Sequence, residues 1–152
     1  MRLYFLRHGK ADWANWKKPD DERPLTKKGK KETRRVAKFL RRFKVKPARI
    51  LSSPLPRAWQ TAEITAKILR VKLKEERALR PGFGIREAVE ILKGRKGKDI
   101  MIVGHEPDFS AVIAAMTGAR IDLAKGGAAC VELESARRGE LVWLVPPMVA
   151  KT

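Results

Sequence analysis

Short apolar runs that alternate with longer amphipathic segments are the feature that most restricts how this chain can fold. Short runs that are rich in β-branched or aromatic side chains, or that end at turn-forming residues, are typical of buried strands. Four such runs are present, at Leu3–Leu6, Arg49–Ser52, Ile100–Val103 and Leu141–Val145. Because strands that alternate with helices favour a mostly parallel sheet with helices on both faces, we expect an α/β fold, a three-layer α/β/α sandwich.

One segment near the C-terminus has a different pattern, in which apolar side chains alternate with other side chains along the chain. Between Ala129 and Glu134, one face is apolar and the other holds Cys130 and two glutamates. This alternation indicates a strand with one buried face, and the Gly126-Gly127 pair before it is a turn signal. We therefore expect an antiparallel edge of the sheet near the C-terminus.

Segments with a helical period fill the gaps between the predicted strands. The capping and proline signals predict helices from about Lys27 with Thr26 as its N-cap, from Ser53-Pro54 to Leu69, from about Gly84 to Leu92, and after Pro107. No internal repeat, linker or low-complexity segment interrupts this order. We therefore predict a single domain over residues 1–152.

Composition argues against several classes of protein. The longest apolar run, Ala111–Met116, is too short to span a bilayer, and the N-terminal apolar stretch is too short for a secretory signal. We therefore expect no membrane partner and a cytoplasmic location. The single cysteine, Cys130, forms no intramolecular disulfide, and with two distant histidines it argues against a zinc site of the usual ligands. We expect a protein without a metal or a cofactor.

Positive charge is concentrated in one segment. The chain has 35 lysines and arginines against 17 acidic residues, a net charge of +18. Eleven of these cations lie between Lys27 and Lys46, where Glu32 is the only acid. Two interpretations stay open, a solvated helix face and an electrostatic surface for an anionic partner. A basic nucleic-acid-binding module would explain this charge, but it would leave the two histidines unexplained.

Both histidines directly follow predicted parallel strands. The chain reads Arg7-His8-Gly9 after the first strand, Ser52-Ser53-Pro54 followed by Arg57 after the second, and Gly104-His105-Glu106 after the third. Ligands of open α/β sheets bind at the carboxyl ends of the strands. Guanidinium groups match phosphate oxygens and a neutral imidazole is a competent nucleophile, so this set indicates a phosphate-handling site.

Four blocks of sequence resemble the histidine phosphatase superfamily, which includes the phosphoglycerate mutases. These blocks are Arg7-His8-Gly9, Arg23-Pro24-Leu25-Thr26 with Gly29, Ser52-Ser53-Pro54 with Arg57 and Thr61, and Gly104-His105. The short chain and the Arg-Pro-Leu-Thr block are most similar to the SixA-type phosphohistidine phosphatases. The resemblance implies a metal-independent phosphatase that acts through a phosphohistidine enzyme intermediate.

The resemblance also implies roles for individual residues. His8 would be the nucleophile, Arg7 and Arg57 would clamp the phosphoryl oxygens, and His105 would complete the catalytic set. Gly9 would let the backbone come close to the bound group, and Arg23 would reach the outer part of the pocket.

No carboxylate occupies the position where larger members of the superfamily place a general acid. The corresponding stretch, residues 78–84, has no acidic side chain, and Glu106 is the best candidate elsewhere. A phosphohistidine substrate relaxes this requirement, because its imidazole leaving group takes a proton from solution near neutrality. We therefore expect a phosphorylated protein as the substrate, for example a histidine phosphotransfer domain.

Alternatives within and outside the superfamily stay open. A small phosphate ester, such as a sugar phosphate, is the second substrate class. Trp13 and Trp16 either wall the mouth of the site or merely cover the core. The sequence does not predict the oligomeric state.

Overall fold

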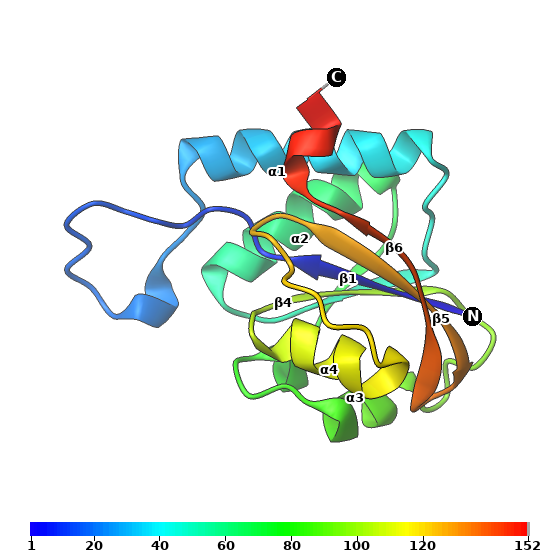
Figure 1. Cartoon of the computed structure of the whole chain (residues 1–152). Helices are drawn as coiled ribbons and strands as arrows, with labels where there is room; N and C mark the ends of the chain where they lie inside the picture. Colours follow the sequence, from blue (N-terminus) through cyan, green and yellow to red (C-terminus); the bar gives the residue numbers. More distant parts are fainter. Residues whose placement is uncertain (152) are drawn as a thin grey trace.

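The computed structural model describes residues 1–151 and contains one six-stranded sheet with the strand order β3-β2-β4-β1-β5-β6 (Figure 1). The strands are β1 (Arg2–Arg7), β2 (Arg49–Ser52), β3 (Leu73–Glu75), β4 (Ile100–Gly104), β5 (Ala128–Ser135) and β6 (Arg138–Val145). β1 to β4 pair in parallel, whereas β5 pairs antiparallel with both β1 and β6. The predicted parallel sheet with an antiparallel edge is confirmed.

Helices cover both faces of this sheet, as expected for an α/β/α sandwich. The helices are α1 (Lys27–Arg42), α2 (Pro56–Leu69), α3 (Ile85–Leu92) and α4 (Asp108–Thr117), with 3-10 turns η1 (Asp20–Glu22), η2 (Arg77–Leu79) and η3 (Pro147–Lys151). α1 and α2 lie on one face, and α3 and α4 on the other (Figure 1). No helix within residues 1–151 has the length and apolarity needed to cross a membrane.

Alternating side chains of β1 build two cores, one on each face of the sheet. Tyr4 and Leu6 pack with the buried residues of α1 and α2, whereas Leu3 and Phe5 pack with those of α3 and α4. Phe5 meets Phe109 of α4 edge to face, with ring centroids 5.2 Å apart. Because both faces are covered, a central strand is apolar at nearly every position.

Two predicted elements differ from those observed. The second helix begins at Pro56 instead of Ser53-Pro54, because the Ser53 hydroxyl accepts the N–H of Leu55 and closes a turn before the helix. The run Leu141–Val145 lies in an edge strand and is not buried: Val142 and Leu144 are 43% and 39% exposed. The short strand β3 was not predicted, because its three residues are mostly polar and only half-buried or exposed.

The parallel register brings the loops after β1, β2 and β4 together. Arg7 is level with Gly104, and Ser52 is level with Val103, so these three strands end at the same edge of the sheet. His8 continues the ladder by donating its backbone N–H to the carbonyl of Gly104 at 3.1 Å. The three predicted motif loops are therefore neighbours in space.

Helix α1 is locked to the loop that follows β1. Thr26 caps the helix, as predicted, by accepting the N–H of Gly29 at 3.0 Å. The backbone N–H of Thr26 donates to the carbonyl of Lys10 at 2.9 Å. A Cβ atom at Gly29 would overlap that same carbonyl oxygen, so only glycine permits this approach.

We expect Gly29→Ala to lower the free energy of unfolding by at least about 1–3 kcal/mol, because the added methyl group forces α1 away from the Lys10 backbone. Lys30→Ala, which changes an exposed neighbour on the same helix, is the matched control and should stay within about 0.5 kcal/mol of the wild type. Denaturant unfolding of the two variants measures this difference. Equal stabilities would show that the close approach is not required.

Candidate active site

Four side chains, which we call the cage, meet at the carboxyl edge of the sheet: Arg7, His8, Arg57 and His105. His8, Arg57 and His105 are only 8%, 6% and 3% exposed, and Arg7 is half-buried. The two imidazole rings lie with their centroids 5.3 Å apart, and the charges of both arginines act on both rings. The structure thus brings together the four residues that the sequence placed at strand ends.

His8 is held in one tautomer by its own backbone. Its Nδ1 atom lies 2.8 Å from the carbonyl oxygen of Gly9. Because a carbonyl oxygen only accepts, Nδ1 carries the hydrogen and Nε2 keeps a free electron pair. Burial, together with the charges of Arg57 and Arg7, lowers the pKa of His8 to about 4, although the Gly9 hydrogen bond acts in the opposite direction. His8 is therefore neutral at pH 7.

His105 is oriented by Ser53, a residue of the predicted motif to which sequence reasoning gave no separate role. His105 Nε2 lies 2.8 Å from the Ser53 hydroxyl, which also accepts the N–H of Leu55 at 3.2 Å. Because the Ser53 hydroxyl proton has no other acceptor within residues 1–151, we assign it to Nε2, which leaves the ring hydrogen on Nδ1. Burial, followed by the neighbouring His8 and the two arginines, lowers the pKa of His105 to about 3, so this ring is also neutral.

The cage holds buried hydrogen-bond donors that have no partner. Arg7 donates from Nη1 to the carbonyl of Leu123 at 2.9 Å, and Arg57 donates from Nη1 to the carbonyl of Asp20 at 3.2 Å. Within residues 1–151, the buried side-chain nitrogen and oxygen atoms that lack a partner are Arg7 Nε, Arg57 Nε and His105 Nδ1. Unpaired buried donors are costly, so their concentration at one point indicates a site for an anion.

Arg57 reaches the cage from the first turn of α2. Burial and the charge of Arg23 lower its pKa, and Asp20 and Asp21 act in the opposite direction. A cation is disfavoured at a helix N-terminus, whereas an anion is favoured there. An anion bound in the cage would therefore interact favourably with both the guanidinium and the helix.

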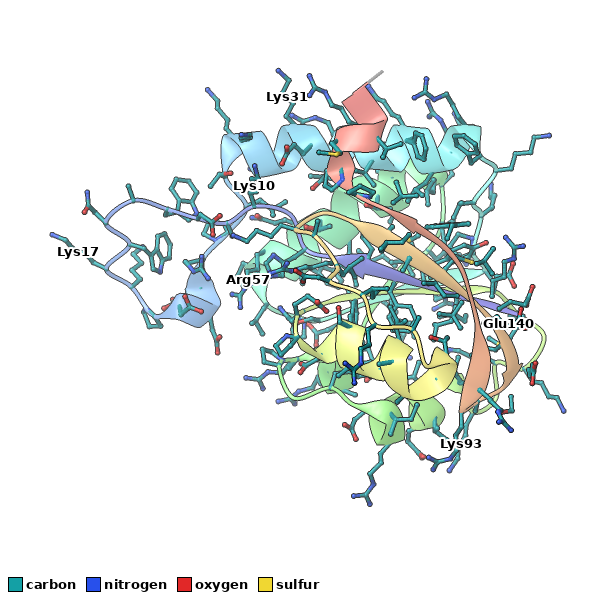
Figure 2. The ribbon with its side chains drawn as sticks, viewed as in Figure 1. Lys10, Lys17, Lys31, Arg57, Lys93 and Glu140 are labelled. Atoms are coloured by element: carbon teal, nitrogen blue, oxygen red, sulfur yellow. The ribbon has the colours of Figure 1, made fainter. Side chains whose placement is uncertain are left out.

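Residues 11–24, which we call the arm, extend from the cage away from the sheet (Figure 2). Arg23 lies at its base, where Nε donates to the Asp20 carboxylate at 2.7 Å and Nη1 donates to the carbonyl of Ala11 at 2.6 Å. Trp13 and Trp16 lie on the arm, 6.1 Å apart, and their indole N–H groups bind carbonyls within it. Their role as walls of the mouth stays a prediction.

Gly9 packs closely against the helices that flank the cage. A Cβ atom there would lie 2.8 Å from the Thr33 hydroxyl and 3.2 Å from the carbonyl of Gly29, both on α1. The Gly9 N–H donates to the Thr61 hydroxyl of α2 at 3.0 Å. Close packing against the helices is therefore one reason for a glycine here, and its predicted role beside a bound group stays a prediction.

Glu106 has both carboxylate oxygens engaged. They accept the N–H of Ser110 at 2.7 Å, the N–H of Leu123 at 3.3 Å and the hydroxyl of Ser110. Since the carbonyl of Leu123 is the acceptor for Arg7, Glu106 holds the segment that positions this arginine. This arrangement favours a positioning role for Glu106 over that of a general acid.

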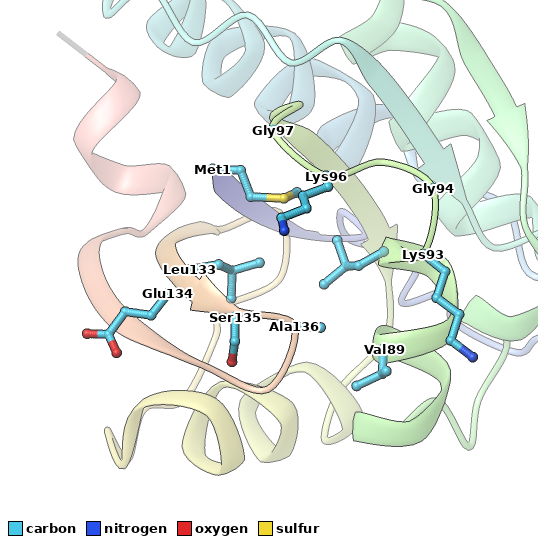
Figure 3. A pocket seen from close by; sticks show the side chains of 11 residues that line it. Met1, Val89, Lys93, Gly94, Lys96, Gly97, Leu133, Glu134, Ser135 and Ala136 are labelled. Atoms are coloured by element: carbon cyan, nitrogen blue, oxygen red, sulfur yellow. The ribbon is translucent and has the colours of Figure 1, made fainter.

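Other features of the chain offer no comparable chemistry. Burial raises the pKa of the Cys130 thiol to about 11, which makes it a poor nucleophile. A hollow of about 690 Å³ near Met1 and Leu133 lies at the amino end of β1, away from the cage (Figure 3). Within residues 1–151, no cluster of three or more histidine, cysteine or acidic side chains is arranged to hold a metal ion.

Comparison with known proteins gives a consistent result. The family model described as histidine phosphatase superfamily (branch 1) matches residues 3–89. An uncharacterised protein of Picosynechococcus sp. is 36% identical over 84% of this chain and 82% of its own length. The phosphohistidine phosphatase SixA of Escherichia coli K12 is 28% identical over 97% of this chain and 94% of its own length. A solved structure of the protein histidine phosphatase SixA with tungstate has a TM-score of 0.89 at 26% identity and covers 99% of this chain and 100% of its own.

We expect both histidine rings to stay neutral from pH 8 down to pH 5.5, because burial disfavours their charged forms. NMR titration of the ring protons measures this directly, since the chain has only two histidines, and a His105→Asn variant assigns the two signals. His8 should titrate near pH 4. Because the unfolded chain binds protons below about pH 6.5 that the folded protein excludes, the free energy of unfolding should fall as the pH drops from 6.5 towards 4. A midpoint near 6.5 for either ring would contradict the described burial.

Proposed function

Because this chain belongs to the histidine phosphatase superfamily (branch 1), we propose that it hydrolyses phosphohistidine on a protein through a phosphohistidine intermediate on His8. The observation that supports this most strongly is the pairing of a neutral imidazole with three unpartnered buried donors. The imidazole supplies a nucleophilic electron pair, and the donors supply a preformed site for phosphoryl oxygens. We further propose that residues 1–152 form one catalytic domain.

In the first step, Nε2 of His8 attacks the phosphorus atom of the substrate. A new N–P bond forms, and the bond between phosphorus and the substrate imidazole breaks with its electron pair leaving on that imidazole. Arg7 and Arg57 neutralise the phosphoryl oxygens, and His105 donates from Nδ1 to one of them. Such preorganised donors stabilise the transition state because they need no reorganisation during the reaction.

In the second step, water attacks the phosphoryl group on His8. The phosphorus–Nε2 bond breaks and its electron pair returns to the ring, while the water loses a proton and inorganic phosphate forms. The Gly9 carbonyl keeps the ring hydrogen on Nδ1 throughout, so the regenerated ring is again a neutral nucleophile. Every group used in these two steps belongs to the cage or to the backbone next to it.

The leaving group supports an N–P substrate over an alkyl ester. Departure of an alkoxide normally requires a positioned acid. Residues 78–84 hold no carboxylate, and the carboxylate of Glu106 is bound to Ser110 and Leu123. A departing imidazole takes a proton from solution at neutral pH, since its pKa is about 6.5. The E. coli relative, which is named a phosphohistidine phosphatase, supports the same choice.

Roles at the edge of the cage follow from the same geometry. Arg23 contributes positive charge from the base of the arm, because its field already lowers the pKa of both His8 and Arg57. Gly9 shapes the nucleophile loop through its packing on α1.

We test this function by measuring turnover in the presence of EDTA on substrates that differ in leaving group. The set consists of a phosphohistidine protein, phosphoramidate, p-nitrophenyl phosphate and an alkyl phosphate. We expect hydrolysis of the first three, whose leaving groups need no positioned acid, and little hydrolysis of the alkyl ester. His8→Ala should lose about a thousandfold or more in kcat on every substrate, because it removes the nucleophile.

A folded His8→Ala protein, verified by circular dichroism, is the control for this loss. Fast hydrolysis of the alkyl ester would show that a general acid is present and that a small phosphate ester is the substrate class. Turnover retained by His8→Ala would overturn the nucleophile assignment.

A further inference from the structure

Helix α1 presents a row of cations that the proposed mechanism does not use. We call this row the basic face, and its members are Lys27, Lys31, Arg34, Arg35, Lys38, Arg41 and Arg42. Six of them are exposed and Arg35 is partly exposed. Figure 2 shows Lys31 on the outer side of α1, pointing away from the sheet. Buried apolar residues such as Val36 and Leu40 explain how α1 packs on the sheet, but they do not explain seven cations on its opposite side.

The charge of the basic face is not balanced within the protein. Within the described residues 1–151, no member of the basic face has a carboxylate at ion-pair distance. Glu32, the only acid between Lys27 and Lys46, pairs with Lys10 at 3.8 Å. Like charges three and four residues apart on a helix repel one another. A partner with negative charge would relieve this repulsion.

The basic face is continuous along the whole helix. Two hollows of about 460 Å³ and 230 Å³ lie on it, and Arg35 lines both of them. Glu32 also lines the first hollow, and Ala150 of η3 lines the second. At about 1.5 Å per residue, the row from Lys27 to Arg42 extends for about 22 Å. This length is sufficient to contact a helix or a domain edge of a partner protein.

The basic face also begins beside the nucleophile. Thr26, the N-cap of α1, donates to the carbonyl of Lys10, which lies two residues after His8. Gly29 packs against that same carbonyl. A macromolecule that lies along α1 therefore comes within reach of the cage.

We propose that the basic face docks the acidic surface of the protein that carries the phosphohistidine. This inference rests on the proposed function and adds the surface by which the substrate protein is recognised. A nucleic acid is the less favoured occupant, because the substrate proposed for the neighbouring cage is a protein, and because Asn or Gln contacts to adenine and aromatic stacking on single-stranded bases would need side chains that α1 does not expose. The only amides of the chain are Asn15 and Gln60, which lie outside α1. Phe39 of α1 is half-buried, and its ring is tilted against that of Phe43 with the centroids 4.6 Å apart.

The experiment compares two triple variants with the same change in net charge. Lys31→Glu/Arg34→Glu/Lys38→Glu reverses the centre of the basic face. The matched control is Lys72→Glu/Lys96→Glu/Lys98→Glu, three exposed lysines away from α1. The substrates are a phosphorylated, acidic histidine phosphotransfer domain and phosphoramidate, each measured over a series of NaCl concentrations.

We expect the basic-face variant to lose about tenfold or more in kcat/KM on the phosphoprotein at low salt, with a weaker salt dependence than the wild type. The basic-face variant should hydrolyse phosphoramidate as fast as the wild type does. This result would also show that the variant is folded. The control variant should stay within about twofold on both substrates. If the glutamate variant fails to fold, Lys31→Gln/Arg34→Gln/Lys38→Gln should show the same selective loss to a smaller degree.

Three results would overturn this docking surface. Equal effects of the two triple variants on the phosphoprotein would show that only net charge matters, and the proposed function would stand. If the wild-type protein hydrolysed phosphoramidate but not the phosphoprotein, the proposed protein substrate would be wrong, and the docking surface with it. Loss of duplex DNA binding in the basic-face variant, with unchanged phosphoprotein turnover, would assign the surface to a nucleic acid.

Discussion

The hydrogen bond from His8 Nδ1 to the carbonyl of Gly9 is the interaction on which the rest of the site depends. It places the free electron pair on Nε2, and it works only if the Gly9 backbone is rigid. That rigidity comes from Thr61 of α2, which accepts the Gly9 N–H, and from α1, whose Gly29 and Thr33 leave no room for a side chain at Gly9. Two helices therefore hold one peptide group so that a single ring nitrogen stays available.

The cage is less stable in isolation than an apolar core of the same size would be. Burial lowers the pKa of His8, His105 and Arg57, and three buried donors lack a partner. The surrounding sheet offsets this cost, because β1 and β4 are buried on both faces. Residues that are energetically unfavourable where they lie, but that the fold tolerates, are typical of functional sites. A bound phosphoryl group would satisfy the donors and neutralise the charge of Arg7 and Arg57.

Much of this arrangement could be predicted from the sequence, because the strand ends fix the positions of both histidines. The parallel register then brings His8 and His105 together without any further information. What the sequence did not predict depends on contacts between segments that are far apart in the chain. The hydroxyl of Ser53 orients His105, and the Glu106 carboxylate holds the backbone that positions Arg7. The Leu141–Val145 part of the edge strand β6 is as apolar as a buried strand, so composition alone did not distinguish them.

The most direct test of this account is to identify the phosphorylated atom of the enzyme during turnover. Rapid mixing with a ³²P-labelled phosphohistidine protein, followed by an alkaline quench and mass spectrometry of the peptides, locates the label. We expect an acid-labile phosphoryl group on Nε2 of His8, because the Gly9 carbonyl leaves only that nitrogen free. A label on Nδ1 of His8 would contradict the tautomer that the Gly9 hydrogen bond indicates, and a label on any other residue would contradict the proposed nucleophile.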